Sequence, residues 1–297
     1  MKENKAIFSA FGFSLIIGLS FMFVKISISY EDQLLILAHR FTFAFIGILI
    51  FIIIKPINLK INLKEFFLVF IISLFYPVMF FSSQILGLSQ TTVTEAGIIQ
   101  AIAPAITVLL GVIFLKESVR KVQLLGIFLS ILGVIFLQRM NEYGMGQLHL
   151  IGNILIIVSI FATAIWQVLS RYITQKIAPI KVTIYIMTIG FIFFNAAYFF
   201  KDGSFYDYTQ SLIQIHYLIA IIFLGVLSTF GTSLLSIYAV SKLPVIQVTV
   251  FNNVATLITI LTGILILREP FYYYHIIGAI IIILGVILVN KQKTNEK

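Results

Sequence analysis

Several side chains that can form hydrogen bonds stand inside long apolar segments of this sequence. Gln84, Gln100, Gln167, Asn252 and Asn253 are carboxamides in such segments. An amide without a partner in hydrocarbon costs several kcal/mol, so these side chains must find hydrogen bonds or water. We interpret them either as polar contacts to a solute in a cavity or as hydrogen bonds between packed helices.

Arg40 is a permanent charge inside an apolar segment. An Arg near the middle of a bilayer costs at least about 2.5 kcal/mol and is a functional hypothesis by default. Arg40 could bind a substrate carboxylate. It also stands close enough to the start of its segment to snorkel outward or to pair with Glu31 or Asp32. His39 titrates near neutral pH, but adjacent residues on a helix face different ways.

Two aromatic residues are candidates for the wall of a cavity. Trp166 is the only tryptophan and could stack on a substrate, or anchor its helix at the interface five residues before Arg171. Tyr76 stands beside Pro77 near the middle of an apolar segment. A phenol at that depth needs a partner, so we expect Tyr76 to line a cavity.

The carboxylates near the segment ends suggest structural roles. Glu117 and Glu269 occupy equivalent segment ends, next to Lys116 and Arg268. We expect them to hold the loop geometry, with gating as the alternative. No buried carboxylate pair suited to sodium or proton coupling stands out, and the nearest candidate, Glu95, is expected at the outer mouth.

Composition places the chain in a membrane. The 297 residues are 60% hydrophobic and 10% charged, with a mean hydropathy of +1.10, whereas soluble domains carry about 25% charged residues. The net charge of +9 sits in short connectors, which favours a topology signal over nucleic-acid binding. There is no cysteine and the four histidines are scattered, so we expect no catalytic residues, no metal site and no cofactor.

The sequence predicts an all-α integral membrane protein with ten transmembrane helices. Apolar segments of about 17 to 25 residues are long enough to cross the hydrocarbon layer. The first follows Lys2 and Lys5 as a signal peptide would, but we expect it to be retained. The expected spans are Ile7–Ile28, Gln33–Ile54, Phe66–Leu88, Thr94–Leu115, Val122–Gln138, Leu148–Leu169, Val182–Phe200, Ile215–Val240, Val245–Leu267 and Phe271–Val289.

Connector charges predict the orientation. With ten spans, fifteen Lys and Arg fall on the side of the N-terminus, two lie within helices, and three fall on the other side, which accounts for all twenty. These three are Arg139, Lys201 and Arg268. Because positive connectors stay in the cytoplasm, we expect a multi-pass protein of the cytoplasmic membrane with both termini inside.

An internal repeat divides the chain into halves at 1–143 and 144–297. A shift of 152 residues lays 100–139 on 252–291 with thirteen identities in forty positions, and brings Gln100 onto Asn252. Each half holds five expected helices, an odd number, so the second half must be inverted in the membrane. Inverted repeats place a solute site near the midplane between the halves and permit alternating access to it.

The sequence resembles the EamA-type carriers of the drug/metabolite transporter superfamily over nearly its whole length. The matching residues are Gly18-Leu19-Ser20-Phe21 through Lys25, Arg40, Ala103-Pro104 through Phe114-Leu115-Lys116-Glu117, Gly126, Gly133, Trp166 with Arg171, Leu267-Arg268-Glu269-Pro270, Gly278 and Gly285. It departs from the family pattern at Ile17 and at Thr256, which replaces the proline of the first half. The resemblance implies a cavity between the halves, faced by Trp166, and movement of amino acids or similar metabolites, often outward.

Together these features predict a secondary transporter that exports amino acids or similar small metabolites by alternating access. Its partners would be a small-molecule substrate and the lipid bilayer, with no nucleic acid, in a monomer or a homodimer. Three alternatives remain open: a non-transporting membrane subunit, a lipid or drug flippase of the same architecture, and a membrane-embedded enzyme. The enzyme would need clustered His, Asp or Glu, which the sequence does not offer.

Overall fold

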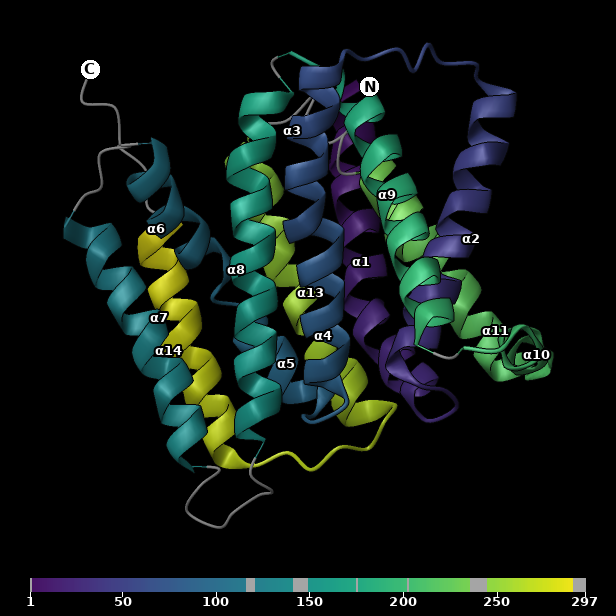
Figure 1. Cartoon of the computed structure of the whole chain (residues 1–297). Coiled ribbons are helices and arrows are strands. Elements are labelled where there is room, and N and C mark those ends of the chain that lie inside the picture. The colour runs from purple at the N-terminus through teal and green to yellow at the C-terminus, as the bar shows by residue number, and fades with distance from the viewer. Residues whose placement is uncertain are drawn as a thin grey trace.

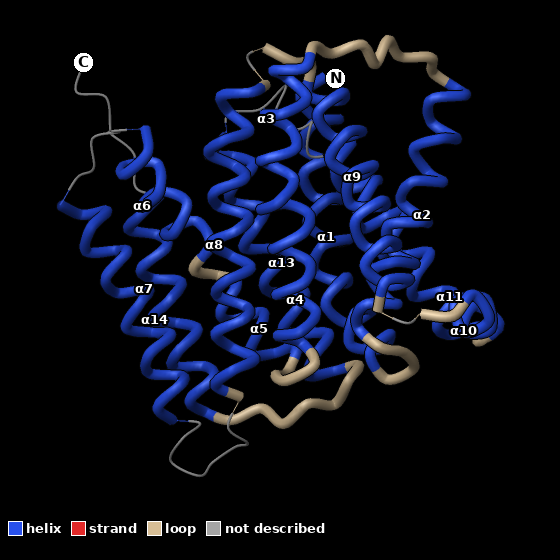
Figure 2. The backbone as a smooth tube through the Cα atoms, in the orientation of Figure 1, coloured by secondary structure: helices blue, strands red, loops and turns tan. Residues whose placement is uncertain are grey.

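The computed structural model describes residues 2–115, 121–140, 149–174, 176–201, 203–235 and 245–290. All regular elements in these ranges are helical, as Figure 2 shows. The α-helices are α1 (Lys2–Ile28), α2 (Gln33–Ile54), α3 (Leu63–Ser73), α4 (Phe80–Leu88), α5 (Val93–Gln100), α6 (Ala103–Leu115), α7 (Lys121–Met140), α8 (Leu150–Ile173), α9 (Pro179–Phe200), α10 (Phe205–Gln210), α11 (Ile215–Ile222), α13 (Val245–Leu265) and α14 (Tyr273–Asn290). Two π-helical segments, η1 (Leu74–Met79) and η4 (Phe223–Gly231), and the short 3-10 helix η3 (Ser211–Ile213) complete them.

Seven helices in the described part of the chain are long and apolar enough to cross a membrane. They are Ile7–Ile28, Gln33–Ile54, Leu63–Leu88, Val93–Leu110, Leu150–Ser170, Pro179–Phe200 and Ile215–Leu235. Shorter apolar helices occupy Lys121–Leu137, Val254–Leu265 and Tyr273–Val289, where the remaining three spans were expected. The protein is therefore a multi-pass membrane protein, and seven of the expected spans overlap helices that are long enough to cross a membrane.

Capping residues in the connectors set where several helices begin. The Asn62 side chain accepts from the backbone N–H of Glu65, and the Glu65 carboxylate accepts from the N–H of Asn62. This reciprocal cap satisfies backbone donors that the first turn leaves free, and it starts α3 three residues earlier than the apolar pattern indicates. Asp32 and Thr92 cap α2 and α5 with one side-chain bond each, accepting from the backbone N–H groups of Leu34 and Glu95.

Two of the expected continuous helices are interrupted within the membrane. The span Phe66–Leu88 is broken at Tyr76, whose backbone is extended (φ −139°, ψ 109°), because the ring of Pro77 excludes the helical conformation from the preceding residue. The span Thr94–Leu115 divides into α5 and α6 after Gln100. Pro104 has no N–H to donate to the carbonyl of Gln100, so one helical hydrogen bond is lost there.

The helices pack as a bundle (Figure 1), and helices at corresponding places in the first and second parts of the chain have corresponding packing partners. Within the bundle α1 packs against α13 and η4, and α8 packs correspondingly against α6 and α4. The shift of 152 residues also carries Leu74–Met79 onto 226–231, inside η4. Both π-helical segments thus stand at equivalent sequence positions.

Glycines allow the helices α7 and α14 to pack closely at one side of the bundle (Figure 1). A Cβ on Gly126 would lie 2.5 Å from the carbonyl oxygen of Gly285. Gly133 and Gly278 are crowded in the same way by Ile282 and Leu137 of the facing helix. These close contacts show that the glycines allow the two helices to pack together.

The two ends of the bundle carry different charges. In Figure 1, α1 begins and α14 ends toward the upper end, where the connection between α2 and α3 also lies. That connection contains Lys55 and Lys60, and the Lys181 ammonium donates to the carbonyl of Lys60. The connection between α1 and α2, at the lower end, contains Glu31 and Asp32.

Candidate functional site

Arg40 is held inside the bundle by hydroxyl groups. Its side chain is 3% exposed, with Nε donating to Thr229 Oγ1 at 2.8 Å and Nη2 to Ser228 Oγ at 3.2 Å. In the described part of the chain no carboxylate lies within ion-pair distance of the guanidinium, so neither Glu31 nor Asp32 is its partner. The charge therefore keeps donor capacity without a counter-ion.

Both hydroxyls that meet Arg40 belong to the π-helical segment η4. Thr229 Oγ1 also donates to the carbonyl oxygen of Leu224, five residues earlier, at 2.8 Å. Single π turns are common at functional sites because they re-aim side chains inside an otherwise regular helix.

An aromatic cluster connects Arg40 with Trp166. The guanidinium carbon of Arg40 lies 4.3 Å from the centre of the Phe81 ring, a cation–π contact. Phe81 contacts Tyr76 with ring centres 5.3 Å apart. Tyr76 in turn stacks on Trp166 at 4.6 Å with the planes inclined by 28°. The structure thus brings three of the expected site residues together, with Phe81 between Arg40 and Tyr76.

Two polar atoms of the expected site residues are buried without a partner. They are the side-chain oxygen Oε1 of Gln100 and the indole nitrogen Nε1 of Trp166. Buried polar groups are almost always hydrogen-bonded, and an orphaned one requires an explanation such as an absent ligand. One is an acceptor and the other a donor, so a solute that offers both kinds of group could satisfy them. Gln100 ends α5 at the break caused by Pro104, and α5 packs against the helix α8 that carries Trp166.

The remaining expected carboxamides differ in their surroundings. Gln167 accepts a hydrogen bond from Thr107 Oγ1 at 3.2 Å, which links α8 to α6. Gln84 is 6% exposed in α4. Asn252 and Asn253 belong to α13, but their side chains lie outside the described residues, as does Glu117.

The sequence patterns missed several residues of this region. Ser228 and Thr229 were not singled out, because hydroxyls are common in membrane helices and nothing nearby marked a π-helical turn. Phe81 could not be distinguished from the other phenylalanines of the chain, which has 29 in all. The shift of 152 residues pairs Tyr76 with Ser228, and this signal in the repeat could have located the hydroxyls.

A second polar cluster lies where α5 meets α8. Glu95, in the first turn of α5, is 5% exposed. Its Oε1 accepts from His149 Nδ1 at 2.9 Å and its Oε2 from Asn153 Nδ2 at 2.8 Å. Thr91 Oγ1 donates to Asn153 Oδ1 at 2.6 Å. Both strong donors to the carboxylate therefore come from α8 and the residue before it.

Lys25 and Glu269 form hydrogen bonds with backbone groups at the end of α4 and the start of α5, next to the same cluster. The Lys25 ammonium donates to the carbonyl oxygens of Leu88 and Thr91, at 2.7 Å and 2.6 Å. The Glu269 carboxylate accepts from the backbone N–H groups of Val93 and Thr94, at 2.7 Å and 2.8 Å. Glu269 thus caps the N-terminus of α5, in agreement with the structural role expected for it.

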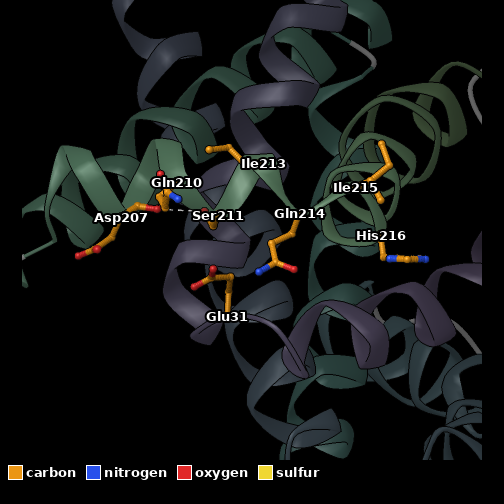
Figure 3. Close-up of a pocket in the computed structure, with 8 residues that line it drawn as sticks. All are labelled: Glu31, Asp207, Gln210, Ser211, Ile213, Gln214, Ile215 and His216. Atoms are coloured by element: carbon orange, nitrogen blue, oxygen red, sulfur yellow. Dashed lines mark hydrogen bonds between the residues drawn. The ribbon is translucent and has the colours of Figure 1, made fainter.

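A cavity of about 530 Å³ lies apart from these residues, beside the connection between α1 and α2. Figure 3 shows the side chains of Glu31 and Gln214 extending toward one another there. Partial burial, with Asp207 and Asp32 nearby, raises the pKa of Glu31. None of the expected site residues lines this cavity. Its lining residues are Glu31, Asp207, Gln210, Ser211, Ile213, Gln214, Ile215 and His216.

Known proteins resemble this chain in sequence and in fold. YcxC, an uncharacterized transporter of Bacillus subtilis (strain 168), is 35% identical over 301 residues, covering 100% of this chain and 96% of its own. UDP-xylose transporter 1 of Arabidopsis thaliana is 27% identical over 188 residues, covering 61% of this chain and 53% of its own. One protein crystal structure matches with a TM-score of 0.62 and 14% identity over 96% of both chains, which shows a shared fold.

The family assignment follows from the extent of the match. The EamA-like transporter family matches residues 4–139 and 150–291, which together cover nearly the whole chain. A relative at 35% identity over the full length agrees with it. Members of this family are membrane transporters for small molecules and not enzymes. The chain therefore belongs to the EamA-like transporter family.

Proposed function

We propose that this transporter carries amino acids, or metabolites of similar size with a carboxylate and an ammonium group, out of the cell. The observation that carries the proposal is Arg40, a buried guanidinium held by two hydroxyls without a carboxylate partner in the described part of the chain. Such a charge inside a membrane protein is stabilised when an anionic group of a solute binds to it.

Other expected site residues offer groups for the rest of such a solute. The stacked rings of Tyr76 and Trp166 offer an apolar face for a side chain. The free Oε1 of Gln100 can accept a hydrogen bond from an ammonium group, and Trp166 Nε1 can donate one to a further acceptor of the solute. This assignment of roles uses every unsatisfied polar atom among the expected site residues that the structure describes.

For the architecture, we propose ten spans arranged as two inverted five-helix halves, at 1–143 and 144–297. Support comes from the matched packing of α1 and α8, and from the equivalent positions of η1 and η4. The halves would rock about the site to open it alternately to each side. The upper, Lys-rich end of Figure 1 would face the cytoplasm together with both termini of the chain, in the cytoplasmic membrane. The outward direction rests on the family resemblance.

Transport by the purified protein in vesicles tests the proposal, with substrates chosen as matched pairs. Tyrosine and tyramine differ only in the carboxylate, as do phenylalanine and phenethylamine. We expect counterflow of the amino acids and at least about tenfold less of the amines, since one charge-assisted bond contributes about that factor. Equal flux of tyrosine and tyramine would contradict the role of Arg40. The absence of amino-acid flux from well-folded protein would contradict the proposed function and favour a flippase or a non-transporting subunit.

A further inference from the structure

Glu95 is a buried carboxyl group whose two oxygens each have a hydrogen-bond donor. One accepts from the imidazole of His149, the residue before α8, and the other from the amide of Asn153 in α8. The Asn153 orientation is fixed by Thr91, which donates to its Oδ1. The carboxylate is thus an acceptor only, and it joins α5 to α8 inside the bundle, at 5% exposure.

The other titratable groups that face this pair are few. Lys25 of α1 and His275 of α14 favour the charged carboxylate, whereas Tyr274 lies near it as a neutral phenol. Glu269, which precedes α14, is neutralised in part by the backbone donors of α5 that it caps and by Lys25. Among the described residues, α4 and α13 bring no ionisable side chain to the pair.

Protonation of Glu95 would weaken this connection. Binding a proton turns the carboxylate into a carboxylic acid, whose new O–H needs an acceptor. At Oε2 the hydroxyl Oγ1 of Thr91, 3.3 Å away, can accept it, and at Oε1 His149 can accept it only in the other imidazole tautomer. The charge-assisted hydrogen bonds from His149 and Asn153 then become neutral ones, which are about half as strong. Release of the proton restores the carboxylate and the strength of both bonds, so the change is reversible and needs no other reactant.

We propose that Glu95 and His149 form the proton-binding site of this transporter and hold one end of the solute pathway closed while Glu95 is ionised. The inference rests on the proposed function, because it names the ion that drives the alternation. Glu95 stands in the first turn of α5 and His149 just before α8. In Figure 1 α5 lies toward the end of the bundle opposite the connection between α2 and α3, which is the outer face in the proposed orientation. A proton from outside would open that face for release of the solute, and loss of the proton would close it again.

The absence of cysteine provides a direct test. Ile99 is 2% exposed and lies four residues after Glu95, on the same face of α5. We would introduce Ile99→Cys, reconstitute the protein, and measure its labelling by a charged thiosulfonate reagent. Ile151→Cys, at an exposed position on α8, gives the reagent's own pH dependence. Helical circular dichroism and a single elution peak establish folding for each variant.

At pH 7.5 we expect Glu95→Gln, the neutral mimic, to accelerate labelling of Ile99→Cys about tenfold or more, the factor for loss of one hydrogen bond to a charged group. His149→Gln keeps a donor but loses the imidazole, so acid-dependent opening should shift to higher pH. His216→Gln, at an exposed histidine, should leave both the rate and its pH dependence unchanged. Slow labelling in Glu95→Gln, or a normalised rate that is constant between pH 5 and 8, would overturn the proton site. Labelling needs no substrate, so failed transport with intact acid opening would count against the proposed function alone.

Discussion

Arg40 illustrates how the surroundings of one residue decide what it can do. A guanidinium paired with an internal carboxylate would be a structural ion pair, whereas in the described part of the chain Arg40 contacts two neutral hydroxyls and an aromatic face. One of these hydroxyls is already in use, since Thr229 also donates to the carbonyl oxygen of Leu224. The binding of an anion that we propose would complete the coordination of Arg40.

Replacing Arg40 tests its role in substrate binding. We expect Arg40→Gln to raise the KM for the transported amino acid tenfold to a hundredfold, because a hydrogen-bonded charge pair contributes about 1.5–3 kcal/mol. Arg40→Lys should recover part of the affinity, since it keeps the charge without the planar fork. The measurement is counterflow in vesicles, with Arg268→Gln, at an exposed arginine, as the matched control. A KM unchanged in Arg40→Gln would remove Arg40 from the site.

Substitution of Gln100 distinguishes a structural role from a functional one. A structural role predicts a loss of stability, whereas a functional role predicts a loss of transport. Because its Oε1 is buried without a partner, Gln100→Leu should leave the protein as stable as before, or more stable by about 1 kcal/mol, while transport falls at least about tenfold. In contrast, Gln123 donates to the carbonyl of Val289. Gln123→Leu should lower the unfolding temperature and spare transport. Loss of stability in Gln100→Leu with full transport would show that Gln100 only packs helices.

At the scale of the elements, the breaks in the helices decide where the polar groups lie. Pro77 and Pro104 stand in the sequence, and a proline inside an apolar run predicts a kink. The π-helical turn of η4 has no proline, and no local rule indicates it. The positions of Tyr76 and Gln100 next to a break were therefore predictable, whereas the hydroxyls that meet Arg40 could be found only in three dimensions.

The contact between α7 and α14 depends on the absence of side chains. We expect Gly126→Leu to destabilise the protein by about 1–3 kcal/mol, since even a Cβ would lie 2.5 Å from the carbonyl oxygen of Gly285. Gly12→Ala is the control, because its Cβ would meet only Leu235 Cδ1, at 3.8 Å. Thermal unfolding in detergent measures both. Equal unfolding temperatures for the two variants would contradict the close packing of these helices.

The connection between α1 and α2 should respond to pH through Glu31. Burial and the nearby carboxylates Asp207 and Asp32 raise the pKa of Glu31 in the folded protein. A raised folded pKa means that the stability from this group is full below the unfolded pKa and is lost as pH rises through the folded pKa. Glu31→Gln should therefore stabilise the protein at pH 7 by a few tenths of a kcal/mol, about the value for exposed charges, and have no effect below pH 4. If the stabilisation by Glu31→Gln instead grew as the pH fell, it would contradict a raised pKa of Glu31.

At the scale of the whole molecule, composition and the lengths of the apolar segments predicted the membrane class and the helical fold, and the resemblance in matching residues predicted the family. The class and the fold depend on length and apolarity, because hydrocarbon leaves the backbone no other hydrogen-bond partners. The buried location of Glu95 was not predictable, because its partners His149 and Asn153 are more than fifty residues away in the sequence. Roles of single side chains depend on such distant contacts, which no local pattern encodes.

Alternating exposure of one position is the most direct test of a carrier built in this way. Thr107 lies beside Gln167 between α6 and α8, and Thr107→Cys would be the only thiol in a chain without cysteine. We would add a membrane-impermeant maleimide to right-side-out and to inside-out vesicles. We expect labelling of Thr107→Cys from both sides, with substrate slowing both rates. Labelling from one side only, unchanged by substrate, would contradict alternating access and indicate a channel or a static subunit.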